Sequence, residues 1–471
     1  MTAPVPAPSP TQKPPRLVVP DLARGLALWG IAMANLTTFW IMNSPEGAIG
    51  KSLGWVDPDS ASDRFSALFS GMLVHTRGLP MFATLLGFGI GLLTSSLHRK
   101  NYPAGKATRV LVKRYGILAV FGLLHMYLLF NGDIMFTYGL AGMLIATMIK
   151  LSSKTLRIFA AVSFCIALLL SAMSVITALA GVDVVPEFTP TEQITTAGTY
   201  FITTIQQAPF FMVNSTFAVL AVLCVMLIGF IWAREGVLAN VDAHRRTLTF
   251  WATLAVVISL TVGIPWGLAA MGVINDQLDQ VFMALNRGLG AFTGPGILAL
   301  IALATNGIQK RMYDDAAAGR PVAAPKILYP FVALGKRSMS GYVAQSFLFI
   351  ILVMPFGFGL GVDSTISEKL LIATGVWLVT LVLAVILEAT NTPGPFEWVH
   401  RRLAYGKTGK IEPYAGPVQQ PALPQQPAYN GPHDAGQAPG EHARRPVGEG
   451  RGALPTPPPG GQFEVEGGGH R

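Results

Sequence analysis

Residues 22–42 read LARGLALWGIAMANLTTFWIM and contain one charged side chain, that of Arg24. A helix rises about 1.5 Å per residue, so about 20 apolar residues cross the roughly 30 Å of hydrocarbon in a bilayer. The chain has ten such windows, of which the fourth and ninth are short or interrupted by Gly and Pro. They cover residues 22–42, 70–97, 110–130, 134–150, 156–181, 210–233, 247–272, 285–307, 338–356 and 368–388. We therefore predict an all-α, polytopic transmembrane helical bundle of about ten spans.

The composition supports a lipid environment. Of 471 residues, 51% are hydrophobic and only 13% are charged, about half the charged share of a soluble protein. The net charge is +9, but the basic residues cluster in short loops between apolar windows, which argues against a nucleic-acid-binding face. Cys165 and Cys224 lie within apolar windows, so we expect neither a disulfide framework nor a metal site.

The loops also predict an orientation. Lys and Arg are frequent in the connections 98–114, 150–157, 233–246 and 309–326, whereas residues 182–208 and 273–284 contain neither. Basic loops stay in the cytoplasm. We therefore place both termini in the cytoplasm.

Three regions differ in composition. Residues 1–19 are Pro-rich and residues 407–471 are rich in Pro, Gly and Gln, so we predict disordered cytoplasmic segments on both sides of a helical domain at 20–406. The first apolar window is too long for a cleavable signal peptide. The C-terminal segment is either an interaction tail or dispensable.

Polar residues in the first window are candidates for function, because ionisable groups are costly in a membrane. Asp21 and Arg24 are three residues apart and can pair on one helix face. Asn35 follows Arg24 by eleven residues, which places both on one face about 16 Å apart. The alternative is an interfacial ion pair at the helix end and an Asn bonded to a neighbouring helix.

The third window repeats this spacing, because His125 follows Arg114 by eleven residues. Both spans would run outward, so each places an Arg near the cytoplasm and a polar group deeper in the membrane. Asp133 follows in an NGD turn. A carboxylate that reaches the imidazole would set its tautomer, as a general base requires. The alternative is a structural histidine.

Two further polar residues are candidates. Arg77 precedes the second window's glycine-rich run and could line an external vestibule, and Gln345 lies within the ninth window. The glycine spacing itself indicates close helix packing.

Five blocks in order carry a resemblance: DLARGLALWGIAMAN, FATLLGFGIG, LLHMYLLFNGDIMFTYGLAG, GKRSMSGYVAQS and GPFEWVHRRLAYG. With them the chain resembles the YeiB-like family of bacterial inner-membrane proteins of unknown function. That family is similar to transmembrane acyltransferases, including the acyltransferase-3 proteins and the heparan-glucosaminide acetyltransferase. Arg24 matches the first-span Arg of the acyltransferase-3 proteins, but Asn35 stands where they have His. His125 after Arg114 is the candidate for the missing base.

The resemblance implies transfer of an acyl group, most simply acetyl, from cytoplasmic acyl-CoA to a cell-envelope glycan or glycolipid. In this hypothesis Arg24 and Arg114 hold phosphates, His125 is the base, Asp133 orients it, and Asn35 donates to the oxyanion. Acyl-CoA would be a substrate, and no bound cofactor is expected. The alternatives are a transporter or export-associated permease and a non-catalytic scaffold.

Overall fold

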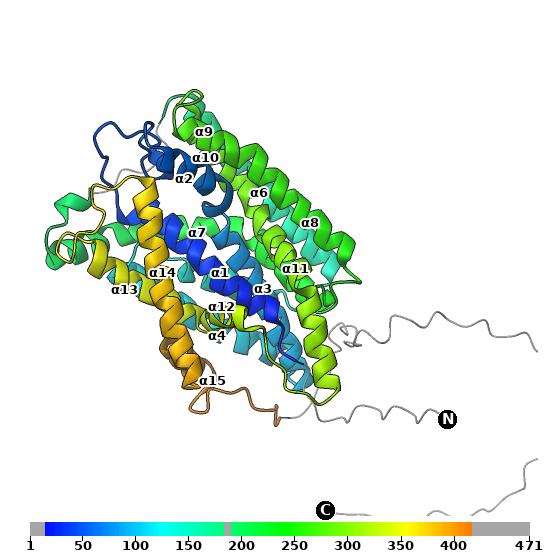
Figure 1. Cartoon of the computed structure of the whole chain (residues 1–471). Coiled ribbons are helices and arrows are strands. Elements are labelled where there is room, and N and C mark those ends of the chain that lie inside the picture. Colours follow the sequence, from blue (N-terminus) through cyan, green and yellow to red (C-terminus); the bar gives the residue numbers. More distant parts are fainter. Residues whose placement is uncertain (1–14, 183–189, 417–471) are drawn as a thin grey trace, which may run out of the picture. The chain divides into compact units, whose positions relative to one another are not determined.

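The computed structural model describes residues 15–182 and 190–416, and its regular structure is helical (Figure 1). Apart from one isolated bridge between Ile49 and Val56, these ranges contain no β-structure. The α-helices are α1 Val18–Asn35, α2 Ala61–Phe69, α3 Gly78–Arg99, α4 Ala104–Leu128, α5 Met135–Thr147, α6 Ser153–Leu179, α7 Ala197–Glu235, α8 Arg245–Ile258, α9 Ile264–Ala270, α10 Leu278–Leu289, α11 Thr293–Ala317, α12 Tyr329–Lys336, α13 Ser338–Val353, α14 Ile366–Ala389 and α15 Pro395–Tyr405. The predicted all-α membrane bundle is confirmed.

All ten predicted windows fall on helices, but not all of these helices are long and apolar enough to be assigned as membrane spans. Seven helical stretches are long and apolar enough to cross a bilayer. The fourth and ninth windows correspond to the shorter helices α5 and α13, of 13 and 16 residues. Helix α1 has 18 residues and carries Asp21 and Arg24. Ten spans therefore remains a prediction that rests on these three helices.

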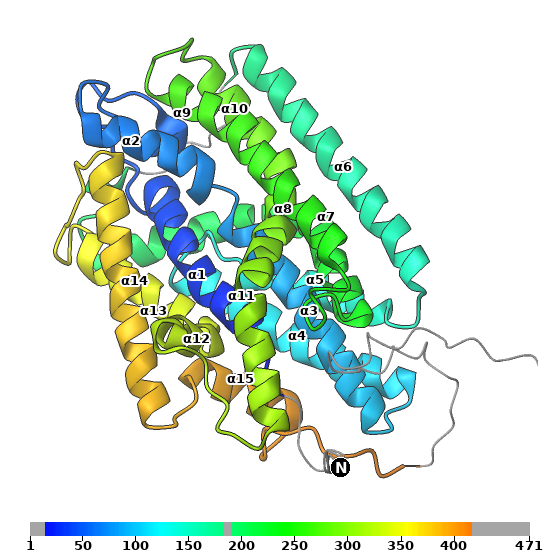
Figure 2. The ribbon, with the colours of Figure 1, turned by 45° about the vertical axis from the view of Figure 1, so that its right-hand side comes forward.

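Large apolar side chains cover the outer faces of several helices. In α6, the exposed residues include Ile158, Val162, Leu169 and Ile176, and only 17% of its apolar window is buried by protein. This helix lies along the edge of the bundle in Figure 2. Such a surface is stable against lipid tails and would be unstable in water.

Helices α3 and α7 pack backbone against backbone through glycines. A Cβ added at Gly87 would lie 1.9 Å from the carbonyl oxygen of Met226, and one added at Gly229 would lie 1.9 Å from that of Thr84. Only glycine permits this approach, which is how membrane helices gain van der Waals contact without a hydrophobic driving force. The prediction of close helix packing at this run is confirmed.

Two of the membrane-spanning stretches are broken. The stretch Ala61–Arg99 is interrupted between α2 and α3, where Thr76 has a φ of 57°. The stretch Arg245–Ala270 contains a π-helical turn at Ser259–Gly263. The two breaks meet, because a Cβ at Gly71 would lie 2.6 Å from the carbonyl oxygen of Gly263.

Arg77 supplies the hydrogen bonds that the first break requires. Its Nε donates to the carbonyl of Met72 at 2.8 Å, and its Nη2 donates to the carbonyl of Gly71 at 3.2 Å. Its Nη1 donates to Asn286 Oδ1 at 2.8 Å and to the carbonyl of Thr76 at 3.3 Å. The side chain is 2% exposed. Contrary to our prediction, Arg77 is therefore a structural residue and does not line an open vestibule, because its donors are used to satisfy carbonyls released by the broken helix.

The predicted domain boundaries shift slightly. Helix α1 begins at Val18, whose amide donates to Gln309 of α11 at 2.9 Å. After α15, the amide of Tyr414 donates to the carbonyl of Lys100, and the Tyr102 hydroxyl donates to the carbonyl of Glu412. Most of the two segments predicted to be disordered, residues 1–14 and 417–471, lies outside the described residues.

Candidate functional site

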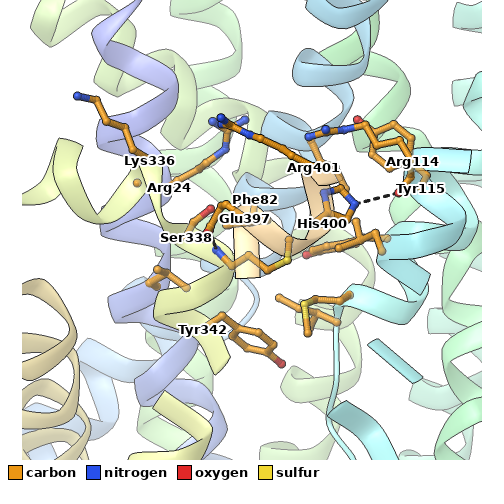
Figure 3. A pocket seen from close by; sticks show the side chains of 18 of the residues that line it. Arg24, Phe82, Arg114, Tyr115, Lys336, Ser338, Tyr342, Glu397, His400 and Arg401 are labelled. Atoms are coloured by element: carbon orange, nitrogen blue, oxygen red, sulfur yellow. Dashed lines mark hydrogen bonds between the residues drawn. The ribbon is translucent and has the colours of Figure 1, made fainter. Parts of the chain in front are cut away.

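A cavity of about 200 Å³ opens between α1, α3, α4, α5, α12, α13 and α15. We call it the arginine cavity, because its lining includes five basic residues and a single carboxylate. The basic residues are Arg16, Arg24, Arg114, Lys336 and Arg401, and the carboxylate is that of Glu397. Figure 3 shows the arginine side chains toward one end of the cavity and Tyr342 toward the other. An excess of positive charge in a cleft attracts anionic ligands.

Asp21 holds two of these arginines in place. Its Oδ1 lies 3.4 Å from Nη1 of Arg24, so the pair predicted from the three-residue spacing is confirmed. Its Oδ2 lies 2.6 Å from Nε of Arg16. Asp21 is 2% exposed, and one buried carboxylate shared by two guanidinium groups leaves a net positive charge at the cavity wall.

Arg114 has no carboxylate partner among the described residues. Its Nη1 donates to the Tyr405 hydroxyl at 2.7 Å, its guanidinium lies 5.5 Å from the Tyr405 ring, and its buried Nε has no hydrogen-bond partner. A buried cationic donor without a partner is unfavourable unless a ligand accepts its hydrogen bond. Arg114 is therefore well suited to bind an anion that enters the cavity.

The acidic groups nearest the cavity are already engaged. Glu397 accepts hydrogen bonds from the amides of Met339 and Ser340, at 2.7 and 3.1 Å, at the N-terminus of α13. Glu388 lies 2.5 Å from both Lys336 and Arg337. A carboxylate bound to a helix N-terminus is stabilised there by the helix dipole, so it neutralises the arginines less.

His400 of α15 also lines the cavity. Its Nε2 donates to the carbonyl of Arg114 at 3.0 Å, because a carbonyl can only accept. Burial, together with the charges of Arg114 and Arg401, lowers the pKa of His400 to about 4. The imidazole is therefore neutral at physiological pH and joins α15 to α4 as a hydrogen-bond donor.

Beyond the cavity, three polar side chains meet inside the bundle. His125 of α4 lies with Nδ1 2.8 Å from Asp133 Oδ2 and with Nε2 2.9 Å from Ser346 Oγ of α13. The other oxygen of Asp133 accepts from the amide of Phe136 at 2.7 Å, which fixes the carboxylate. All three side chains are at most 4% exposed. The structure thus brings Asp133 to His125, as the sequence suggested, and adds Ser346.

This arrangement has the order of a nucleophile, a base and a group that orients the base. Nδ1 and Asp133 Oδ2 are close enough for an ion pair, although neither atom has a hydrogen bond of good geometry among the described residues. A proton on Nδ1 leaves Nε2 as an acceptor for the Ser346 hydroxyl. Sequence reasoning missed Ser346. Ser346 ends the sequence GKRSMSGYVAQS, four residues after Tyr342. Nothing in that sequence indicates which neighbouring helix the serine side chain faces.

Tyr342 separates the three residues from the arginine cavity. It lines the cavity, and its ring lies 5.1 Å from that of His125. Ser338, Tyr342 and Ser346 are spaced by four residues and share one face of α13. The cavity therefore ends one helical turn from Ser346.

The remaining candidates lie apart from this site. Asn35 is buried at the end of α1, lines no part of the arginine cavity, and forms no hydrogen bond with His125. The structure therefore gives no support to its predicted role as oxyanion donor. Gln345 donates to the carbonyl of Leu28 at 3.3 Å and so ties α13 to α1. Within the described ranges, no three His, Cys, Asp or Glu side chains gather as metal ligands do.

Comparisons with known proteins agree with the resemblance to the YeiB-like family. The model of a family described as a protein of unknown function (DUF418) matches residues 232–407. The uncharacterized protein YxaH of Bacillus subtilis is 23% identical over 414 residues, which cover 84% of this chain and 96% of the relative. The uncharacterized protein YeiB of Escherichia coli is 22% identical over 415 residues, or 84% and 97%. These matches support a YeiB-like family.

Proposed function

We propose that this protein is a membrane-embedded acyltransferase of the bacterial inner membrane. It takes an acyl group, most simply acetyl, from cytoplasmic acyl-CoA and transfers it to a hydroxyl of a cell-envelope glycan or glycolipid. The observation that carries the proposal is a histidine beside a carboxylate, with 2.8 Å between His125 Nδ1 and Asp133 Oδ2, just beyond a cavity whose lining has more arginines than carboxylates.

The arginine cavity suits the donor. Arg24 and Arg114 bind phosphate oxygens through charge-assisted hydrogen bonds, and the unpartnered Nε of Arg114 provides a free donor. A volume of about 200 Å³ is too small for the whole of CoA. The nucleotide therefore stays at the mouth, and the linear pantetheine arm extends along α4 toward His125, about 16 Å from Arg114.

His125 then acts as the general base. The Asp133 carboxylate holds the proton on Nδ1 and stabilises the imidazolium that forms when Nε2 accepts a proton. The low-dielectric surroundings strengthen this interaction. Such a base contributes on the order of 100- to 10,000-fold to the rate.

A transporter is the second candidate, because broken helices are typical of substrate sites in transporters. The breaks at 75–77 and 259–263 are the observation that favours it. Against it, the carbonyls at the first break are occupied by Arg77, which leaves them unavailable for a transported ion.

Acyl-CoA binding and transfer distinguish the two candidates. Saturating CoA should raise the melting temperature of purified protein, since a ligand at 100 times its Kd stabilises by about 2.7 kcal/mol. Arg114→Ala should lose this shift, whereas the matched control Lys113→Ala, an exposed neighbour, should keep it.

Transfer from radiolabelled acetyl-CoA to an envelope extract tests the chemistry. His125→Ala should bind CoA normally but transfer at least 100-fold more slowly. Absence of any CoA-dependent stabilisation of the unmodified protein, or full transfer by His125→Ala, would refute the proposal.

A further inference from the structure

The contact between Ser346 and His125 has the geometry of an activated nucleophile. The 2.9 Å separation of Ser346 Oγ and His125 Nε2 lies within the range for a serine that transfers its proton to a base. Asp133 occupies the third position on the opposite nitrogen. Direct transfer by His125 alone would need no serine at this position.

A second cavity is lined by Phe130, which lies near His125. This aromatic cavity, of about 70 Å³, is lined in part by Phe39, Trp40, Phe130, Tyr200 and Phe211. The Phe130 ring lies 6.2 Å from that of His125 and stacks on Trp40 at 4.9 Å.

The two cavities are separate. The residues that line the arginine cavity and those that line the aromatic cavity have no member in common. Arg24 of α1 lines the first cavity, and Trp40, sixteen residues later in the π-helical turn Leu36–Trp40, lines the second. The His125 ring lies near one lining residue of each cavity, with 5.1 Å to the ring of Tyr342 from the arginine cavity and 6.2 Å to the ring of Phe130 from the aromatic cavity. A donor in one cavity and an acceptor in the other would not meet directly.

We propose that Ser346 is a nucleophile that carries the acyl group between the two cavities as a covalent ester. The inference rests on the proposed function and specifies its mechanism as two displacements. Donor and acceptor then never need to occupy one chamber, because the acyl-serine is formed from the arginine cavity and consumed from the aromatic cavity.

In the first displacement, Ser346 Oγ attacks the thioester carbonyl while its proton moves to His125 Nε2. The new C–O bond forms, the C–S bond breaks, and the sulfur leaves with the electron pair and takes the proton from His125 as free CoA thiol. In the second, the acceptor hydroxyl gives its proton to Nε2 and attacks the ester. The acceptor C–O bond forms, the bond to Oγ breaks, and Oγ recovers the proton.

Movement of Tyr342 gives the donor access. Its hydroxyl has no side-chain hydrogen-bond partner among the described residues and interacts only with the backbone of Ile134, so rotation of the ring gives up that backbone contact alone. Because Tyr342 and Ser346 are one turn apart on α13, a displaced ring opens the arginine cavity directly onto Oγ.

Trapping the ester tests the inference. Purified protein is incubated with radiolabelled acetyl-CoA without acceptor, digested and analysed by mass spectrometry. We expect a hydroxylamine-labile acetyl group on the peptide that contains Ser346, and its absence in Ser346→Ala and His125→Ala. Ser174→Ala, a partly exposed serine of α6, is the matched control and should be labelled normally. Ser346→Ala should also slow transfer on the order of 1,000-fold.

A second probe does not depend on the acyl donor. A fluorophosphonate should label Ser346 in the unmodified protein and fail to label Ser346→Ala. If Ser346→Ala does not fold, Ser346→Cys retains a nucleophile of similar size and should form a hydroxylamine-labile thioester. Ping-pong kinetics are expected.

The outcomes separate this inference from the proposed function. Full transfer by Ser346→Ala, with no ester in the unmodified protein, overturns the serine intermediate but leaves an acyltransferase in which His125 acts directly. Absence of both transfer and CoA-dependent stabilisation overturns the proposed function. Failure of both acetyl-CoA and the fluorophosphonate to label Ser346 overturns the inference.

Discussion

Replacement of Gly87 by Ala tests how α3 and α7 hold the bundle together. The added Cβ would lie 1.9 Å from the carbonyl oxygen of Met226 and 2.6 Å from its carbonyl carbon. Real Cβ atoms essentially never approach closer than 3.0 Å, so the two backbones must separate by at least 1.1 Å, the difference between 3.0 and 1.9 Å. Backbone atoms cannot rotate away as a flexible side chain can.

The expected cost follows from two opposing terms. Overpacking of a tight contact costs about 1–3 kcal/mol. We expect a cost at the upper end of this range, because the new Cβ would meet only backbone atoms of Met226. Ala gains up to about 1 kcal/mol over Gly in helix propensity. We therefore expect Gly87→Ala to lower the free energy of unfolding by about 2 kcal/mol.

The control is Gly89→Ala in the same helix. Its Cβ would meet only Nη2 of Arg24, at an ordinary 3.6 Å, so this variant should be unchanged or slightly more stable. Equilibrium unfolding in mixed micelles with increasing dodecyl sulfate, followed by tryptophan fluorescence, measures both. If Gly87→Ala and Gly89→Ala have the same free energy of unfolding, the close packing of α3 on α7 does not contribute the expected stability.

Two other side chains give independent tests. Arg77→Met and Arg77→Lys should both lower the free energy of unfolding by about 3 kcal/mol. Met has no donor, and the single ammonium group of Lys cannot reach all the acceptors that the guanidinium group satisfies together. An Arg77→Lys variant as stable as the unmodified protein would contradict this. His400 has a folded-state pKa near 4 and an unfolded pKa near 6.5. The unfolded chain therefore binds the proton first, and stability should fall by up to about 3 kcal/mol between pH 6.5 and 4. His400→Gln should flatten this fall in unfolding titrations at several pH values, and an unchanged slope would exclude His400 as its source.

Geometry within a helix or an adjoining turn was accessible from the sequence. Asp21 and Arg24 pair as their three-residue spacing predicts. Asp133 reaches His125 because a short turn returns the chain to the end of the helix that it has just left. In both cases the separation along the chain is small, so backbone geometry alone limits where the side chains can lie.

Contacts between distant helices were not accessible. Ser346 is 221 residues from His125 and Tyr405 is 291 residues from Arg114, yet each pair forms a hydrogen bond. Arg77 appeared to be a candidate for ligand binding because a buried arginine and an exposed one look alike in sequence. Only the broken helix beside it shows where its donors go.

Hydropathy alone was sufficient to predict a helical membrane protein, because backbone polar groups in lipid must be hydrogen-bonded within the protein and a long apolar helix does this within one segment. Which helices become neighbours depends on packing. Lipid tails are as apolar as the helices, so small differences in contact, such as the glycine surfaces of α3 and α7, select the partners. The tertiary structure therefore decided that α4 and α13 meet at His125 and Ser346, two residues that lie far apart along the chain.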